Sequence, residues 1–143
     1  MRSFWVDVNV WLALSSDRYL HYETAHRWFG NVGPGGAAFC RFTQLGYLRL
    51  LTNARAMGRD VLNQAGAWRV YDTLCQDARV TFVSEPLEVE SAFRRLTQRR
   101  DAAINVWTDA YLAALAKTRG LTIVSFDQGF RSLDGVDTLI LSN

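Results

Sequence analysis

Short apolar runs and longer amphipathic stretches alternate along the chain. Five runs have the length and the continuous hydrophobicity of strands that are buried on both faces. They cover residues 4–9, 37–40, 79–83, 121–125 and 136–141. The stretches between them place apolar side chains every three or four residues, which predicts amphipathic helices. These helices cover residues 9–14, 21–29, 43–51, 61–75, 86–96 and 106–119.

This alternation of strands and helices is typical of a parallel sheet with helices on both faces. We therefore predict an α/β fold, a single three-layer α/β/α sandwich with a mainly parallel central sheet. The chain has 143 residues, of which 49% are hydrophobic. That length suits one domain with a substantial core, so we expect a single domain over residues 1–143.

Polar residues and a glycine mark the predicted helix ends. Asn9, Thr43, Asp60 and Asn105 stand where an N-cap side chain can accept a backbone N–H of the first turn. Gly120 follows the last helix, at a position where a left-handed residue commonly ends a helix. These residues set the predicted helix boundaries.

Three aspartates occur beside the ends of buried elements. Asp7 lies at the end of the first strand, Asp127 follows the fourth, and Asp109 lies in the first turn of an alanine-rich helix. Because open parallel sheets bind ligands at the carboxyl ends of their strands, we predict that the three carboxylates face one rim. Each also has an ordinary alternative role: Asp7 as a helix cap, Asp127 in a turn, and Asp109 beside a helix dipole.

A cluster of carboxylates needs either partial protonation or a bound cation. Mg²⁺ and Mn²⁺ prefer oxygen ligands, and a water that they activate can attack a phosphodiester. Asn9 and Ser125 lie two residues from an aspartate, so we expect them to support the carboxylates or bound waters. The predicted catalytic and metal-binding residues are Asp7, Asp109 and Asp127.

Composition restricts the partners and the compartment. The formal net charge of +2 and the pI near 8.7 permit contact with nucleic acid without requiring it. Lys117 is the only lysine among the 16 lysine and arginine residues. The predominance of arginine suits bidentate contacts with phosphate, but it follows equally from an arginine-rich coding bias. Cys40 and Cys75 form no CxxC pair, so we expect buried, reduced thiols. Without an apolar leader or a run of about 18 apolar residues, we expect a cytoplasmic protein with no membrane span.

Three stretches taken together resemble a known family. They are residues 6–14, residues 42–50, and residues 107–116 continuing through Gly120 to residues 124–130. Their order and spacing are similar to those of the PIN-domain ribonucleases, and within these to the VapC-type toxins of bacterial and archaeal toxin–antitoxin pairs. The resemblance spans nearly the whole chain.

The resemblance implies a Mg²⁺- or Mn²⁺-dependent endoribonuclease whose metal is held by Asp7, Asp109 and Asp127. It also implies an RNA substrate, a homodimer as the usual working form and a cognate antitoxin protein that silences the enzyme. In this family a fourth acid, commonly Glu, begins the middle helix, and Gln44 stands in that place. Because an amide carries no charge, we expect Gln44 to support the ion more weakly than a carboxylate.

Two alternative functions stay open. One is a PIN-like module that binds RNA or a partner without cutting, which the neutral Gln44 favours. The other is a signalling receiver domain, but receivers carry a lysine at a late strand end and Lys117 lies within a predicted helix. Arg49 and the arginines of residues 94–100 are candidates for contact with an RNA backbone, although solvated helix surfaces explain them equally well.

Overall fold

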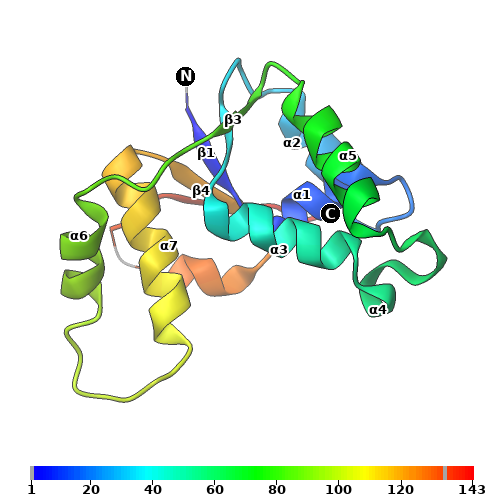
Figure 1. Ribbon diagram of the computed structural model, residues 1–143. Coiled ribbons are helices and arrows are strands. Elements are labelled where there is room, and N and C mark those ends of the chain that lie inside the picture. The colour runs from blue at the N-terminus through cyan, green and yellow to red at the C-terminus, as the bar shows by residue number, and fades with distance from the viewer. Residues whose placement is uncertain (1, 134) are drawn as a thin grey trace.

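The structure, a computed structural model, describes residues 2–133 and 135–143. Within this part of the chain, five parallel strands form one sheet in the order β3-β2-β1-β4-β5 (Figure 1). The strands are β1 (Phe4–Val6), β2 (Ala37–Phe39), β3 (Val80–Phe82), β4 (Thr122–Ser125) and β5 (Thr138–Ile140). The predicted parallel sheet is confirmed, with each strand somewhat shorter than its apolar run.

Helices cover both faces of the sheet. They are α1 (Val8–Ser15), α2 (Tyr22–Phe29), α3 (Arg41–Leu51), α4 (Ala54–Met57), α5 (Gln64–Cys75), α6 (Val89–Leu96) and α7 (Val106–Arg119). Two short 3-10 helices are η1 (Gly58–Asp60) and η2 (Gln128–Ser132). In Figure 1, α6 and α7 lie together at one side of the molecule, while α2 and α5 lie at the other.

The alternation of side chains along each strand divides the core into two clusters. Phe4 and Val6 of β1 belong to a cluster with buried side chains of α1, α2, α3 and α5. In this cluster Trp11 stacks on Phe39, with ring centroids 3.9 Å apart. Trp5, which points the other way, belongs to a second cluster with side chains of α6, α7 and η2. These two layers of helices around one sheet confirm the predicted three-layer sandwich.

The strand order reverses at β1. The chain moves from β1 to β2 and β3, then returns to the other side of β1 for β4 and β5. Such a reversal leaves a crevice at the carboxyl ends of the two strands that flank it, where doubly wound sheets bind ligands. Asp7 directly follows β1, and Asp127 lies two residues beyond the end of β4. The topology therefore brings both aspartates to the same crevice.

The first and third helices begin earlier than predicted. Asp7, not Asn9, is the N-cap of α1, and its Oδ1 accepts the N–H of Val8 at 2.8 Å. Cys40 is the N-cap residue of α3, and the Thr43 hydroxyl accepts the N–H of Cys40 at 2.9 Å from within the first turn. At α1 the sequence offered both Asp7 and Asn9 as caps, whereas at α3 the N-cap position falls on Cys40, a residue that is not a typical cap.

Among the later helices, α5 and α6 each begin three residues after their predicted starts, whereas α7 has its predicted bounds. Asn63 replaces Asp60 as the N-cap of α5, and its Oδ1 accepts the N–H of Gly66 at 2.8 Å. Asn105 occupies the N-cap position of α7 without a side-chain cap hydrogen bond. Gly120 ends α7 with φ of 66°, the left-handed conformation that its position predicted.

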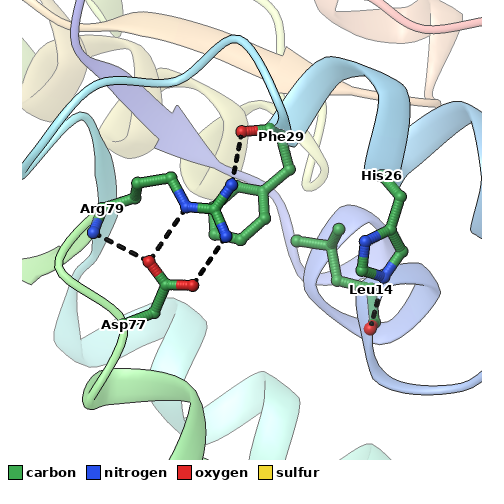
Figure 2. Close-up of polar contacts among 5 residues, drawn as sticks. All are labelled: Leu14, His26, Phe29, Asp77 and Arg79. Carbon is green, nitrogen blue, oxygen red and sulfur yellow. Dashed lines mark hydrogen bonds and ion pairs between the residues drawn. The ribbon is translucent and has the colours of Figure 1, made fainter.

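The edge strand β3 is anchored to α2 by an arginine (Figure 2). Arg79 Nε and Nη2 donate to the two oxygens of Asp77 at 2.9 and 2.7 Å, and these bonds lower the pKa of Asp77 to about 2. Arg79 Nη1 donates to the carbonyl of Phe29 at 3.1 Å, and the guanidinium lies 3.8 Å from the centroid of the Phe29 ring. The end of α2 is thereby fixed against the start of β3.

The two cysteines differ from each other. Cys40 is buried, and its sulfur accepts a hydrogen bond from Trp5 Nε1 at 3.3 Å. Cys75 is exposed, so the prediction of a buried thiol is right for Cys40 and wrong for Cys75. Cys75 is the last residue of α5, and the last turn of that helix faces solvent.

None of the helices in residues 2–133 and 135–143 has the length and hydrophobicity needed to cross a membrane.

Candidate metal centre

A buried hydroxyl joins the end of β1 to the end of β4. Ser125 is fully buried, and its Oγ donates to Asp7 Oδ2 at 2.6 Å. Ser125 Oγ also accepts the N–H of Asp127 at 2.9 Å and a hydrogen from Asn9 Nδ2 at 3.3 Å. Asn9 Oδ1 in turn accepts the N–H of Phe126 at 3.3 Å. Four of the residues predicted from the sequence, Asp7, Asn9, Ser125 and Asp127, therefore form one hydrogen-bonded group.

The ordinary roles considered for two of the aspartates are also observed. Asp7 caps α1, and Asp127 Oδ1 accepts the N–H of Gly129 at 2.8 Å in the turn that begins η2. These roles do not compete with ion binding, because each carboxylate oxygen has two lone pairs and accepts more than one contact. The turns hold the two carboxylates at the crevice.

Asp109 approaches the same region from the layer formed by α6 and α7. It lies in the first turn of α7, whose Ala113 and Ala116 are 1% and 0% exposed. These small side chains let the helix lie close to the sheet. Asp109 lines a cavity of about 440 Å³ together with Asn105 and Ser132, among others.

The three carboxylates are coupled electrostatically. Burial raises the pKa of Asp7, hydrogen bonds from Ser125 and the Val8 N–H oppose this, and the charges of Asp127 and Asp109 raise the pKa further. Burial also raises the pKa of Asp109, and the charge of Asp127 adds to the effect. The ion pairs found among the described residues involve other aspartates and glutamates. A bound cation would relieve the repulsion that these carboxylates share.

The charges of the three carboxylates interact, but the three groups do not form a closed cage. In the parts of the chain that the structure covers, no three His, Cys, Asp or Glu side chains are grouped closely enough to hold an ion together. Mg²⁺ keeps several waters and commonly binds through only one or two direct carboxylates. An open rim of hard oxygen donors with uncompensated negative charge therefore fits such an ion.

Gln44 contacts a neighbour on its own helix, and its supporting role at the ion stays a prediction. Its side chain is buried, and its Oε1 accepts a hydrogen bond from Arg41 Nη1. It lines a cavity of about 400 Å³ with Arg41 and Tyr71, between α3 and α5. The α3 residue that lies against the start of α1 is Gly46, whose added Cβ would stand 2.9 Å from Val8 Cγ2. Residues two apart on a helix point in different directions, so Gln44 and Gly46 face different neighbours.

Arg49 also lies away from the aspartates. It is exposed on α3 and lines a cavity of about 300 Å³ with Trp68 and Thr52. The structure gives Arg49 no contact with the crevice at the ends of β1 and β4. Its role in substrate binding stays a prediction.

Two residues beside Asp109 were missed as site residues. The sequence marks Asn105 only as a helix cap and does not single out Ser132, yet both line the cavity that contains Asp109. Asn105 precedes Asp109 by one helical turn, which is a signal that the sequence does contain. Ser132 reaches the cavity through the turn of η2, which no local pattern predicts.

Comparison with known proteins identifies the family. Residues 5–136 match the model of the PIN domain family. The chain is 36% identical over 141 residues to ribonuclease VapC41 of Mycobacterium tuberculosis, covering 95% of this chain and 97% of that protein. The chain therefore belongs to the PIN-domain family. Within that family, it is of the VapC type.

Solved structures support the fold independently. The M. tuberculosis toxin VapC20, described as cleaving the sarcin–ricin loop, superposes with a TM-score of 0.67 at 18% identity, covering 98% of this chain and all of that one. A chain of a toxin–antitoxin complex from Klebsiella pneumoniae superposes with a TM-score of 0.59 at 16% identity, covering 94% and 95% of the two chains. At these identities the likeness concerns the fold alone.

Proposed function

We propose that this protein is a Mg²⁺- or Mn²⁺-dependent endoribonuclease that acts as the toxin of a toxin–antitoxin pair. The observation that carries the proposal is the Ser125 hydroxyl, which holds Asp7 Oδ2 and the Asp127 N–H at one crevice. Asp109 is the proposed third ligand, a choice supported by its place in the first turn of α7 and by its charge coupling with Asp127 and Asp7. The ribonuclease relative covers 95% of the chain, which supports the same reaction.

In this proposal Asp7, Asp109 and Asp127 hold the ion. When bound, the ion supplies a water nucleophile at neutral pH and stabilises negative charge on the phosphoryl oxygens. Ser125 orients Asp7 and, by donating a hydrogen bond, favours its ionised form, which is the form that binds a cation. Asn9 fixes the backbone at Phe126, between the residues that carry the hydroxyl and the second carboxylate. The chain thus positions the donors before the ion arrives.

The partners follow from the family and the comparisons. We propose a cognate antitoxin protein, because the chain shares its fold with one chain of a solved toxin–antitoxin complex. We also propose a homodimer, to be checked by sedimentation of the purified protein. We further propose that residues 1–143 form a single domain.

The alternative is a module that binds RNA without cutting it. It keeps some support because α3 offers no acid to the rim: Gln44 contacts Arg41, and Gly46 has no side chain. The three remaining carboxylates still provide enough donors for one hydrated ion, which favours the nuclease.

Cleavage of a labelled RNA pool with and without Mg²⁺ or Mn²⁺ tests the proposal. We expect metal-dependent cleavage that Asp7→Asn lowers by about 100-fold or more, because loss of charge weakens metal binding while an Asn cap preserves the fold. Asp17→Asn, an exposed aspartate beyond the end of α1, is the matched control and should cleave normally. Full cleavage in excess EDTA would contradict the mechanism, and metal-stimulated RNA binding without products would favour the non-cutting module.

A further inference from the structure

We propose that the segment joining α6 to α7 forms two adjoining subsites for consecutive nucleotides of single-stranded RNA, with Arg99 between them. The choice of RNA as the ligand rests on the proposed function. In Figure 1 this segment extends beyond the neighbouring ends of α6 and α7, next to the start of the helix that carries Asp109. The inference depends on two cavities that share a wall.

The first cavity contains a proposed metal ligand. Its volume is about 440 Å³, and its polar lining consists of Arg99, Asn105, Asp109 and Ser132. Leu96 contributes to its apolar lining. This volume is within the range of small-molecule sites, and the lining combines hydrogen-bonding groups with an apolar surface for a ribose or base. A nucleotide here would lie directly beside Asp109.

The second cavity adjoins the first at Arg99 and Val106, which line both. Its volume is about 280 Å³, and its other lining residues include Thr97, Asp101 and Trp107. A chain that occupied both cavities would have to pass Arg99. In RNA, the group that joins two neighbouring nucleosides is a phosphodiester.

Arg99 is suited to bind that phosphodiester. Its side chain is 48% exposed, and its one ion pair within residues 2–133 and 135–143 is with Asp101, which is itself 51% exposed. Exposed ion pairs contribute little to stability, so a phosphate can replace the carboxylate of Asp101 without disturbing the fold. The guanidinium then offers a bidentate contact to the phosphate oxygens.

Trp107 supplies a surface for a base. Its side chain is 58% exposed, although it packs edge-to-face against Phe93 with centroids 6.0 Å apart. A large exposed aromatic ring beside an arginine is the combination that single-strand-binding proteins use to stack bases and follow the backbone. Ile104 is more exposed, at 81%, but lines neither cavity. Substitution of Ile104 is therefore the control for substitution of Trp107.

Binding measured in EDTA tests these subsites separately from catalysis. Fluorescence anisotropy with a labelled eight-nucleotide RNA of mixed sequence gives the affinity, and gel analysis confirms that the RNA stays intact. We expect Arg99→Ala to weaken RNA binding about tenfold, whereas Arg100→Ala, on the same segment but outside both cavities, should change it less than twofold. Equal losses for the two variants would show general electrostatic attraction and overturn the proposal.

Inorganic polyphosphate, which has phosphates but no bases, separates the two roles. Arg99→Ala should weaken its binding as well, while Trp107→Ala should weaken RNA binding at least fivefold and leave polyphosphate unchanged. Trp107→Phe should restore part of the RNA affinity, and Ile104→Ala should match wild type. Loss of polyphosphate binding in Trp107→Ala, or unchanged RNA binding, would overturn the second subsite. If polyglutamate binds more tightly than RNA and its binding depends on Arg99, the cavities bind an acidic protein and the proposal of RNA subsites is wrong.

The two proposals fail in different ways. If wild type shows no metal-dependent cleavage but RNA binding in EDTA still depends on Arg99 and Trp107, the nuclease proposal is wrong and the subsites stand. If cleavage depends on metal but neither variant alters RNA affinity or KM, the subsites are wrong and the nuclease stands.

Discussion

Asp7 is held firmly by its neighbours and is electrostatically unfavourable at the same time. It caps α1 and accepts a hydrogen bond from Ser125, but burial and the two other aspartates raise its pKa. A carboxyl group with a raised pKa binds its proton more tightly in the folded chain than in the unfolded chain. The stabilisation from that proton is complete at low pH and is lost as the pH rises through the folded pKa.

We therefore predict that Asp7→Asn stabilises the metal-free protein relative to wild type, and more so as the pH rises from about 4, the usual pKa of Asp, to neutrality. Asn keeps an oxygen that caps the helix but never ionises. Urea denaturation in EDTA across this pH range measures the difference in free energy of unfolding. Asp17→Asn provides the control curve, and a difference that stays constant with pH would contradict the prediction.

At the scale of elements, the approach of α3 to α1 depends on the absence of a side chain. A Cβ on Gly46 would lie 2.9 Å from Val8 Cγ2, closer than the two atoms can pack. Val8 directly follows Asp7, so the position of the carboxylate depends on the contact between these helices. A glycine within α3 lowers helix propensity, and the close packing explains its presence.

Gly46→Ala should therefore lower the free energy of unfolding by about 1–3 kcal/mol, the usual cost of overpacking a core. Gly30→Ala is the matched control, because its added Cβ would meet only the Arg27 and His26 carbonyls, at 3.5 Å or more. Urea denaturation of the metal-free variants makes the comparison. Equal stability of Gly46→Ala and wild type would show that α3 shifts freely and that the contact does not fix α1.

At the scale of the whole molecule, the proposed ion would connect parts of the chain that pack in different layers. Asp7 caps α1, which packs on one face of the sheet, while Asp109 lies on α7, which packs on the other face. Asp127 follows the strand between them. An ion bound by these residues would stabilise the assembled layers and leave the unfolded chain unaffected.

We predict that saturating Mn²⁺ raises the Tm of wild type, since a ligand at 100 times its Kd adds about 2.7 kcal/mol to stability. Asp109→Asn should lose most of this increase, because it removes the donor from the α7 layer. Asp72→Asn, exposed on α5, should retain it. Differential scanning calorimetry in EDTA and in Mn²⁺ makes the measurement. An equal rise in all three proteins would place the ion elsewhere.

The sequence by itself determined the order of elements, the parallel sheet and the family. Buried strands such as residues 121–125 appear as continuous apolar runs, and helices appear as periodic ones, because both patterns arise from local backbone geometry. It also identified Asp7 and Asp127 as neighbours, since both follow strands and parallel strands end at one edge. The exact helix starts were less certain, because Asp7 and Asn9 are equally good caps.

Only the tertiary structure decided which groups meet. The hydrogen bond from Ser125 to Asp7 joins residues 118 positions apart, and no local pattern specifies its direction. The packing of α3 against α5 and β3 places Gln44 and Tyr71 at one cavity, although the hydrogen bond from Arg41 to Gln44 is a local contact between residues three apart on α3. The cavities around Arg99 likewise arise where α6, α7 and the segment between them pack together. Periodicity determines which face of an element is buried, whereas packing between distant elements determines which side chains on those faces touch.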